Sequence, residues 1–96
     1  MKIIRVQIQV PRSGDGFKTR EAWIAEALGA TWTHRRGYTV ASANRAAQFA
    51  ALCAVPDISA SRRYFASDRK PYTFSHPRLG TLSLRDMLKA IAPART

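Results

Sequence analysis

The feature that most constrains the fold of this chain is the stretch from Thr19 to Ala54, TREAWIAEALGATWTHRRGYTVASANRAAQFAALCA, which contains both tryptophans and the single cysteine. Its pattern predicts a helix, a short break, a β-hairpin and a second helix. Thr19 and Ser42 are suitable N-cap residues for the two helices, and Gly29 is a suitable left-handed residue to end the first. The stretch therefore predicts a fold that combines helices with an antiparallel sheet.

The register of the hairpin can also be predicted. If Arg35-Arg36-Gly37 forms a three-residue loop with its glycine in the left-handed conformation, His34 pairs with Tyr38 and Trp32 pairs with Val40. The alternative is a two-residue turn formed by Arg36 and Gly37. In the preferred register the four paired side chains share one face of the hairpin. We expect this face, including Trp32, to be buried beneath the helices.

The residues on either side of this stretch have strand patterns. Residues 2–10 (KIIRVQIQV) alternate apolar and polar side chains, which predicts a half-buried strand, and residues 11–18 (PRSGDGFK) predict a loop. Further along, short strands are expected at Arg63–Ala66 and Tyr72–Ser75, around a turn at residues 67–71, with another turn at Pro77–Gly80. Ser83 then caps a last helix. The side chains of this helix that should face the core are Leu84, Met87, Leu88 and Ile91.

The predicted order of elements is therefore β-α-β-β-α-β-β-α, which belongs to the α+β class. Residues 1–96 are expected to form a single small basic domain, because a chain of this length cannot enclose a second core. The first six elements follow the order of a split β-α-β, ferredoxin-like arrangement. The alternative is a layer of three helices on a less regular antiparallel sheet.

Charge is the strongest functional signal in the sequence. Sixteen Lys and Arg against six Asp and Glu give a formal net charge of +10. Most of these cations are arginine, whose planar guanidinium suits bidentate contact with phosphate or carboxylate. Such a positive field favours nucleic-acid backbones, anionic membranes or acidic proteins as partners. No predicted helix combines a cationic face with a wide apolar one, so a membrane is not expected among them.

The cysteine count and the first residues indicate a compartment. A single cysteine excludes an internal disulfide, so the sequence does not indicate a small secreted domain stabilised by disulfides. The alternating pattern of residues 2–10 lacks the continuous apolar run of a signal peptide or a membrane span. We therefore expect a cytoplasmic protein.

The richest basic region lies in and around the second predicted hairpin, where cations alternate with aromatic residues. This composition is typical of proteins that bind nucleic acid in a groove or as single strands. The alternative without a binding function is an ordinary amphipathic hairpin, whose aromatic side chains lie in the core and whose charged side chains are solvated. We expect nucleic acid, either DNA or RNA, held mainly through its phosphates by Arg35, Arg36, Arg62, Arg63, Arg69, Lys70 and Arg78. The candidate stacking residues are Tyr38, Tyr64 and Tyr72.

The sequence offers no convincing catalytic set. Cys53 lies on the apolar face of its predicted helix, which favours a buried and unreactive thiol. His34 and His76 lack the repeated His-x-Thr or His-x-Ser pairs of two-histidine phosphodiesterases. One cysteine and two histidines also show no metal-ligand spacing. We therefore expect a non-enzymatic binding protein without a cofactor or metal.

The alternative function is inhibition through contact with a host protein. Small, single-domain, highly charged chains are common among phage and mobile-element accessory proteins, including inhibitors of host defence of the anti-CRISPR type, although no motif here is specific for them. The host protein would offer an acidic or apolar surface, and the apolar residues near Phe17 and Trp23 could form the contact. An unpaired sheet edge would also allow a strand-paired dimer.

Overall fold

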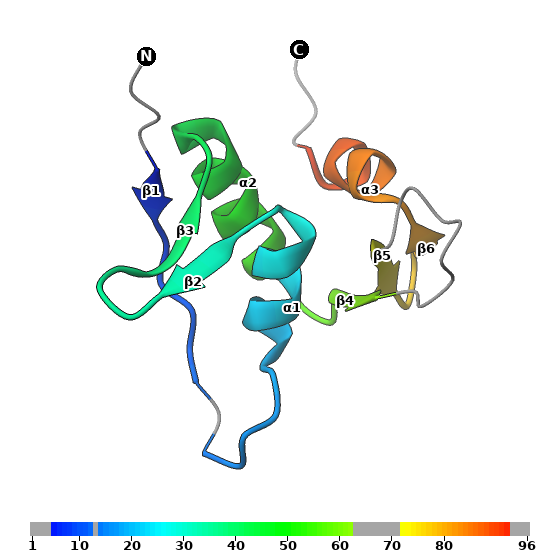
Figure 1. Ribbon diagram of the computed structural model, residues 1–96. Coiled ribbons are helices and arrows are strands. Elements are labelled where there is room, and N and C mark those ends of the chain that lie inside the picture. Colours follow the sequence, from blue (N-terminus) through cyan, green and yellow to red (C-terminus); the bar gives the residue numbers. More distant parts are fainter. Residues whose placement is uncertain (1–4, 13, 63–71, 93–96) are drawn as a thin grey trace.

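The computed structural model describes residues 5–12, 14–62 and 72–92, and within these ranges six strands and three helices follow one another (Figure 1). In chain order they are β1 (Val6–Gln7), α1 (Arg20–Ala27), β2 (Thr31–Thr33), β3 (Gly37–Val40), α2 (Ala43–Cys53), β4 (Ser59–Arg62), β5 (Tyr72–His76), β6 (Gly80–Leu82) and α3 (Leu84–Ile91). The α+β class predicted from the sequence is confirmed.

All three helices begin where their capping residues predict. The hydroxyl groups of Thr19, Ser42 and Ser83 each accept a hydrogen bond from the backbone N–H three residues further on, at 3.1–3.2 Å. Each bond satisfies one of the amide donors that the first turn of a helix leaves without a partner. The first helix ends as expected as well, because Gly29 follows it with a φ of 81°.

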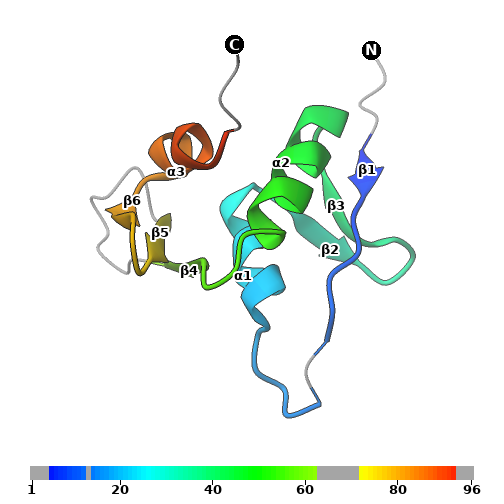
Figure 2. The same cartoon turned by 180° about the vertical axis from the view of Figure 1, so that it is seen from behind.

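The first sheet contains the N-terminal three strands in the order β1-β3-β2, with both pairs antiparallel. This is the order in which a hairpin strand lies between the two strands of a split β-α-β unit. Helices α1 and α2 cover one face of this sheet, as the two opposite views show (Figures 1 and 2). Val40 on the central strand β3 is completely buried beneath them, while every residue of the edge strand β2 is exposed.

The observed hairpin register differs from the predicted one by two residues. Trp32 pairs with Tyr38 and Thr33 pairs with Gly37, so residues 34–36 form the connection. The Oγ1 of Thr33 accepts a hydrogen bond from the backbone N–H of Arg36 at 3.2 Å, and this contact stabilises a turn that starts one residue earlier than expected. Gly37 has the predicted left-handed conformation, with a φ of 68°.

The second sheet has the order β4-β5-β6, again antiparallel throughout. Strand β6 was not predicted, so the described order is β-α-β-β-α-β-β-β-α. Strand β4 ends at Arg62, just before the strand predicted at residues 63–66. That predicted strand and the predicted turn at residues 67–71 lie outside the described residues. In a ferredoxin-like fold the strand after α2 would join the first sheet, whereas here it pairs with β5 in a separate one.

Both sheets contribute to one hydrophobic cluster. Its completely buried members include Val40 from the first sheet, Phe74 from the second, and one residue from each helix: Ile24, Leu52 and Met87. The predicted core face of the last helix is confirmed, because Leu84, Leu88 and Ile91 pack against the same cluster as Met87. The two sheets are therefore held together by shared side-chain packing, with α1 contacting β4 and α3 contacting β5.

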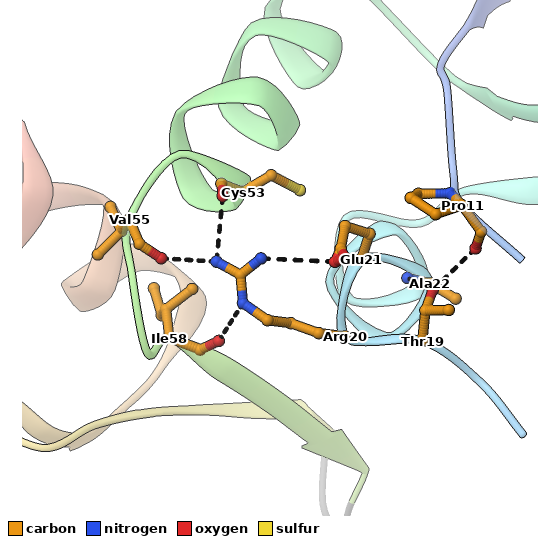
Figure 3. A network of polar contacts seen from close by, with 8 residues as sticks. All are labelled: Pro11, Thr19, Arg20, Glu21, Ala22, Cys53, Val55 and Ile58. Atoms are coloured by element: carbon orange, nitrogen blue, oxygen red, sulfur yellow. Dashed lines mark hydrogen bonds and ion pairs between the residues drawn. The ribbon is translucent and has the colours of Figure 1, made fainter. Parts of the chain in front are cut away.

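Arg20, the first residue of α1, adds a polar connection to this packing (Figure 3). Its guanidinium donates hydrogen bonds to the backbone carbonyl oxygens of Cys53 at 3.1 Å, Val55 at 2.6 Å and Ile58 at 2.7 Å. It also lies 3.5 Å from a carboxylate oxygen of Glu21. The carbonyls at the C-terminal end of α2 lack partners within the helix and carry its negative dipole end, so a cation suits this position.

Candidate functional site

A hollow of about 280 Å³ opens between the loop that joins β1 to α1 and the β2–β3 hairpin. In Figure 1 this loop is the long connection at the bottom of the molecule, and the hairpin lies above it on the left. The side chains of Arg12, Phe17 and Lys18 line the hollow from the loop, and Trp32 and Tyr38 line it from the hairpin. We call this hollow the loop–hairpin groove.

The loop is tied together at its base by Thr19. The hydroxyl of Thr19 donates a hydrogen bond to the carbonyl oxygen of Pro11 at 3.0 Å and accepts one from the backbone N–H of Ala22 (Figure 3). Within the loop, a carboxylate oxygen of Asp15 accepts a hydrogen bond from the N–H of Phe17 at 3.1 Å. The helix cap and the closure of the loop therefore depend on the same hydroxyl group.

Trp32 is the main aromatic surface of the groove, and 43% of it is exposed. The expectation that it would be buried is wrong, because β2 is an edge strand whose side chains extend beyond the cover of α1 and α2. The His34 ring and the indole of Trp32 pack in a T-shaped arrangement, with a centroid distance of 4.7 Å and an interplanar angle of 67°. The guanidinium carbon of Arg12 lies 5.9 Å from the indole centroid, near the outer limit of a cation–π contact.

Tyr38 lies directly opposite Trp32 on the neighbouring strand and is half-buried. Its ring packs against the hydrophobic core cluster while also lining the groove. As one of the predicted stacking residues, Tyr38 is therefore placed beside the exposed indole. The two aromatic residues are cross-strand partners, and both line the groove.

Lys18 lines the groove but its charge is already paired. Its Nζ lies 2.5 Å from a carboxylate oxygen of Glu26 and 4.5 Å from the centroid of Trp23. The hydrogen bond to Glu26 raises the pKa of Lys18 above its ordinary value, against the opposing effect of partial burial. Lys18 therefore supplies less net positive charge to the groove than its position suggests.

Two predicted phosphate-binding residues, Arg35 and Arg36, lie exposed in the turn of the hairpin beside the groove. Arg36 donates a hydrogen bond through Nη2 to the carbonyl oxygen of Arg5 at 3.0 Å, which directs it toward β1 and leaves its other nitrogens available. Arg5 in turn donates to the side chain and the carbonyl of Thr39 at 2.9 and 2.8 Å. Three arginines are thus gathered around the hairpin.

The second predicted basic region is only partly described. Arg63, Tyr64, Arg69 and Lys70 lie outside the described residues. Arg62 is exposed at the end of β4, opposite the half-buried Tyr72, which is the first residue of β5. Arg78 is exposed in the turn that follows β5, at the other end of that strand. The structure therefore separates Arg62 from Arg78 by the length of a strand.

Two residues considered for catalysis, Cys53 and His76, lie in environments that do not favour it. Burial raises the pKa of the Cys53 thiol to about 11, despite the opposing attraction of Arg20, so the thiol is protonated at neutral pH. The Nδ1 of His76 accepts hydrogen bonds from the backbone N–H groups of Arg78 and Leu79 at 3.1 and 3.4 Å, which stabilise the turn between β5 and β6. The imidazole of His76 therefore has a role in local structure, and the thiol of Cys53 is held in its less reactive protonated form.

In residues 5–12, 14–62 and 72–92, no group of three or more His, Cys, Asp or Glu side chains is placed to hold a metal ion. None of the helices in these ranges has the length and apolar character needed to cross a bilayer. Comparisons with known proteins gave no match to a family model, to a curated protein or to a solved structure.

Sequence reasoning named the region of Phe17 only as a possible apolar contact with a host protein, and it did not anticipate Arg12 or the groove. Arg12 and Phe17 belong to a stretch rich in glycine and proline with no regular period, so no pattern indicated where their side chains would lie. Phe17 is 78% exposed, and a large apolar residue in such a loop was the available signal. The groove itself depends on how the loop folds back toward the hairpin, which local sequence does not specify.

Proposed function

We propose that this protein is a non-enzymatic binding protein whose partner is nucleic acid, held mainly through its phosphates at the β2–β3 hairpin and the adjacent loop. The observation that carries the proposal is that Arg12 lines the loop–hairpin groove and shares the adjoining hollow with Arg36, which is followed back along the hairpin turn by the exposed Arg35. Within the described part of the chain the ion pairs given by the geometry are Lys18–Glu26 and Arg20–Glu21, and neither involves the three arginines named above. Arginines that are not neutralised by carboxylates can be neutralised by phosphates.

The overall charge supports the same conclusion. A net charge of +10 on 96 residues produces a field that attracts polyanions and speeds their encounter with the protein. Arginine also binds phosphate in a bidentate manner through its planar guanidinium. Arg62 and Arg78, both exposed, would add contacts at a distance from the hairpin.

The test is fluorescence anisotropy with labelled single-stranded RNA, single-stranded DNA and duplex DNA at three or more salt concentrations. A log–log salt slope of roughly −3 to −6 is expected, because each neutralised phosphate releases counterions. The double variant Arg35→Ala/Arg36→Ala should weaken binding and reduce the slope by about 1 to 2. The matched control is Arg45→Ala/Arg85→Ala, which removes the same charge from the first turns of α2 and α3.

Equal losses in the two double variants would show that the hairpin arginines are not a local contact site. Absence of salt-sensitive binding to all three probes would overturn the proposal.

A second candidate function, contact with a host protein as an inhibitor, is favoured by Phe17. This side chain is 78% exposed on the loop, and an exposed aromatic of this size is a common anchor in protein interfaces. The test is recovery of one defined partner after nuclease treatment, followed by loss of that partner in Phe17→Ser. Recovery that depends on intact nucleic acid would count against this candidate.

A further inference from the structure

We infer that the loop–hairpin groove holds one unpaired nucleobase stacked on Trp32, so that the ligand is single-stranded nucleic acid. This inference rests on the proposed function and adds to it the strand state of the ligand and the residue that recognises it. The argument comes from the exposure of the indole, the size of the groove and the arrangement of charge at its rim.

The exposure of Trp32 is the first observation. An indole with 43% of its surface in water leaves a large apolar face unburied, although the same strand pair buries Val40 completely. Among the described residues, the ring contacts of Trp32 are a T-shaped one with His34 and a cation–π contact with the guanidinium of Arg12 at 5.9 Å. Neither contact covers the ring in the way that a stacked base would. Bases stack on such surfaces with little dependence on their identity, because every base has a π-face.

The size of the groove is the second observation. Its volume of about 280 Å³ lies just below the range of roughly 300–1,000 Å³ typical of sites for drug-sized ligands. A smaller hollow of about 150 Å³ continues from it along β3 and shares Arg12, Trp32 and Tyr38 with it. A planar group the size of one base suits the first hollow, and the second leads toward Arg36, which also lines it.

The charge at the rim is the third observation. Arg12 lines both hollows beside the indole, and Arg36 also lines the second of them. The two phosphates that flank a base could therefore each meet a guanidinium. Asp15 lies in the loop, and Glu26 pairs with Lys18, so the loop side of the groove carries less net positive charge. This arrangement suits a short segment of one chain rather than the dense phosphates of a duplex.

Base pairing is the physical reason for the preference. In a duplex the bases are paired and stacked on one another, so Trp32 could not cover a base face without unstacking it. A duplex would contact the arginines through its phosphates alone. A single strand gains the same phosphate contacts together with the stacking interaction.

The test begins with Trp23→Phe, which leaves Trp32 as the only tryptophan of the chain. Its fluorescence should be quenched when a single-stranded oligonucleotide binds, and should change little with a duplex of the same length. Trp32→Ala should weaken single-strand binding about 5- to 100-fold, the range expected for loss of one stacked base, and should leave duplex binding within about twofold. Trp32→Phe should retain most of the single-strand affinity.

Because Trp32 lies on an exposed edge strand, these variants should fold, and thermal melting checks this. The quenching measurement does not depend on any change at position 32. Salt-sensitive binding that is equal for single strands and duplexes, with Trp32 unquenched, would overturn this inference and leave the proposed function standing. Absence of salt-sensitive binding to any probe would overturn both.

Discussion

The guanidinium of Arg20 donates a 2.6 Å hydrogen bond to the carbonyl oxygen of Val55, which joins the start of α1 to the chain just beyond α2. Two further hydrogen bonds from the same side chain reach the carbonyl oxygens of Cys53 and Ile58. Arg20 therefore fixes the segment that connects α2 to β4, the first strand of the second sheet. The preceding residue, Thr19, closes the loop that forms one wall of the groove. The consecutive residues Thr19 and Arg20 therefore connect α1 to the loop of the groove and to the segment that leads into the second sheet.

Replacing Arg20 should strongly destabilise the fold. Arg20→Ala is expected to lower the free energy of unfolding by about 2–4 kcal/mol, because three carbonyls lose a charged donor. Arg20→Lys should recover only part of this loss, since one ammonium cannot reach all three oxygens. Urea denaturation measures both. The control is Arg45→Ala, whose side chain bonds only to Gln48 among the described residues, with an expected loss below about 0.5 kcal/mol. Equal losses at the two positions would contradict this interpretation.

Thr19 should matter for both stability and binding. Thr19→Val removes the hydroxyl that caps α1 and closes the loop, with an expected loss of about 1 kcal/mol in the free energy of unfolding. Single-strand affinity should also fall, because the loop is no longer held at its base beside Trp32. Thr19→Ser keeps the hydroxyl and should restore both properties, as urea denaturation and anisotropy can show. Loss of stability with unchanged affinity would show that loop closure does not shape the groove.

Gly37 should be specifically required for the hairpin. Its φ of 68° lies in the left-handed region, where a side chain costs about 1 kcal/mol or more, although a Cβ would meet no atom within 4 Å. Gly37→Ala should therefore destabilise the protein by about that amount through backbone strain alone. Gly14→Ala is the matched control, because Gly14 has equal space and no positive φ. Thermal melting compares the two, and equal effects would argue against strain at the hairpin.

A feature of the fold could be predicted from the sequence when it depends on residues that are close together in the chain. The three helix caps and the conformation of Gly37 were predicted correctly, because each depends on residues within a single turn: a hydroxyl side chain in the caps, and the absence of a Cβ at Gly37. The pairing of Trp32 and the separation of β4 from the first sheet were not predicted, because they depend on contacts distant in sequence. Arg20 shows the same limit: its position predicts a helix start, whereas its three partners lie more than thirty residues away.

The site was predicted to a similar extent. Arg35, Arg36 and Tyr38 were named as candidates because a hairpin turn rich in arginine is visible in the sequence, and their role in binding stays a prediction. Tyr38 lines the groove and Arg36 lines the hollow next to it. The expected burial of Trp32 failed because sequence periodicity indicates a face but not whether a strand lies at the centre or the edge of a sheet. The contribution of Arg12 follows from the folded path of an irregular loop.

Cys53 should react slowly in the folded protein. Burial raises the pKa of its thiol from 9.0 to about 11, so the thiolate fraction at pH 8 is about 100-fold lower than in the unfolded chain. Alkylation by iodoacetamide should be slower by at least about that factor than in urea, and the difference should narrow as the pH approaches 11. Because the chain has one cysteine, mass spectrometry of the labelled protein reports this site alone. Equal rates in the folded and unfolded protein would contradict the described burial.

The ion pair of Lys18 and Glu26 should give a stability difference that depends on pH. The pKa of Lys18 is raised above 10.5 in the folded protein, so its stabilising effect is fully present below pH 10.5 and is lost as the pH rises through the folded pKa. Lys18→Met should lower the free energy of unfolding by less than about 1 kcal/mol at pH 7, because the lysine side chain is 45% exposed and screened by solvent.

In urea denaturation, the difference in free energy of unfolding between Lys18→Met and the parent protein should be constant up to about pH 10 and should shrink as the pH rises above 10.5. Titration of Cys53 occurs in both proteins over this range and therefore cancels in the comparison. A constant difference across the range would mean that Lys18 stabilises the fold through packing on Trp23 rather than through its charge. In that case the methionine variant should also lose little stability at pH 7, because its side chain can cover the same ring.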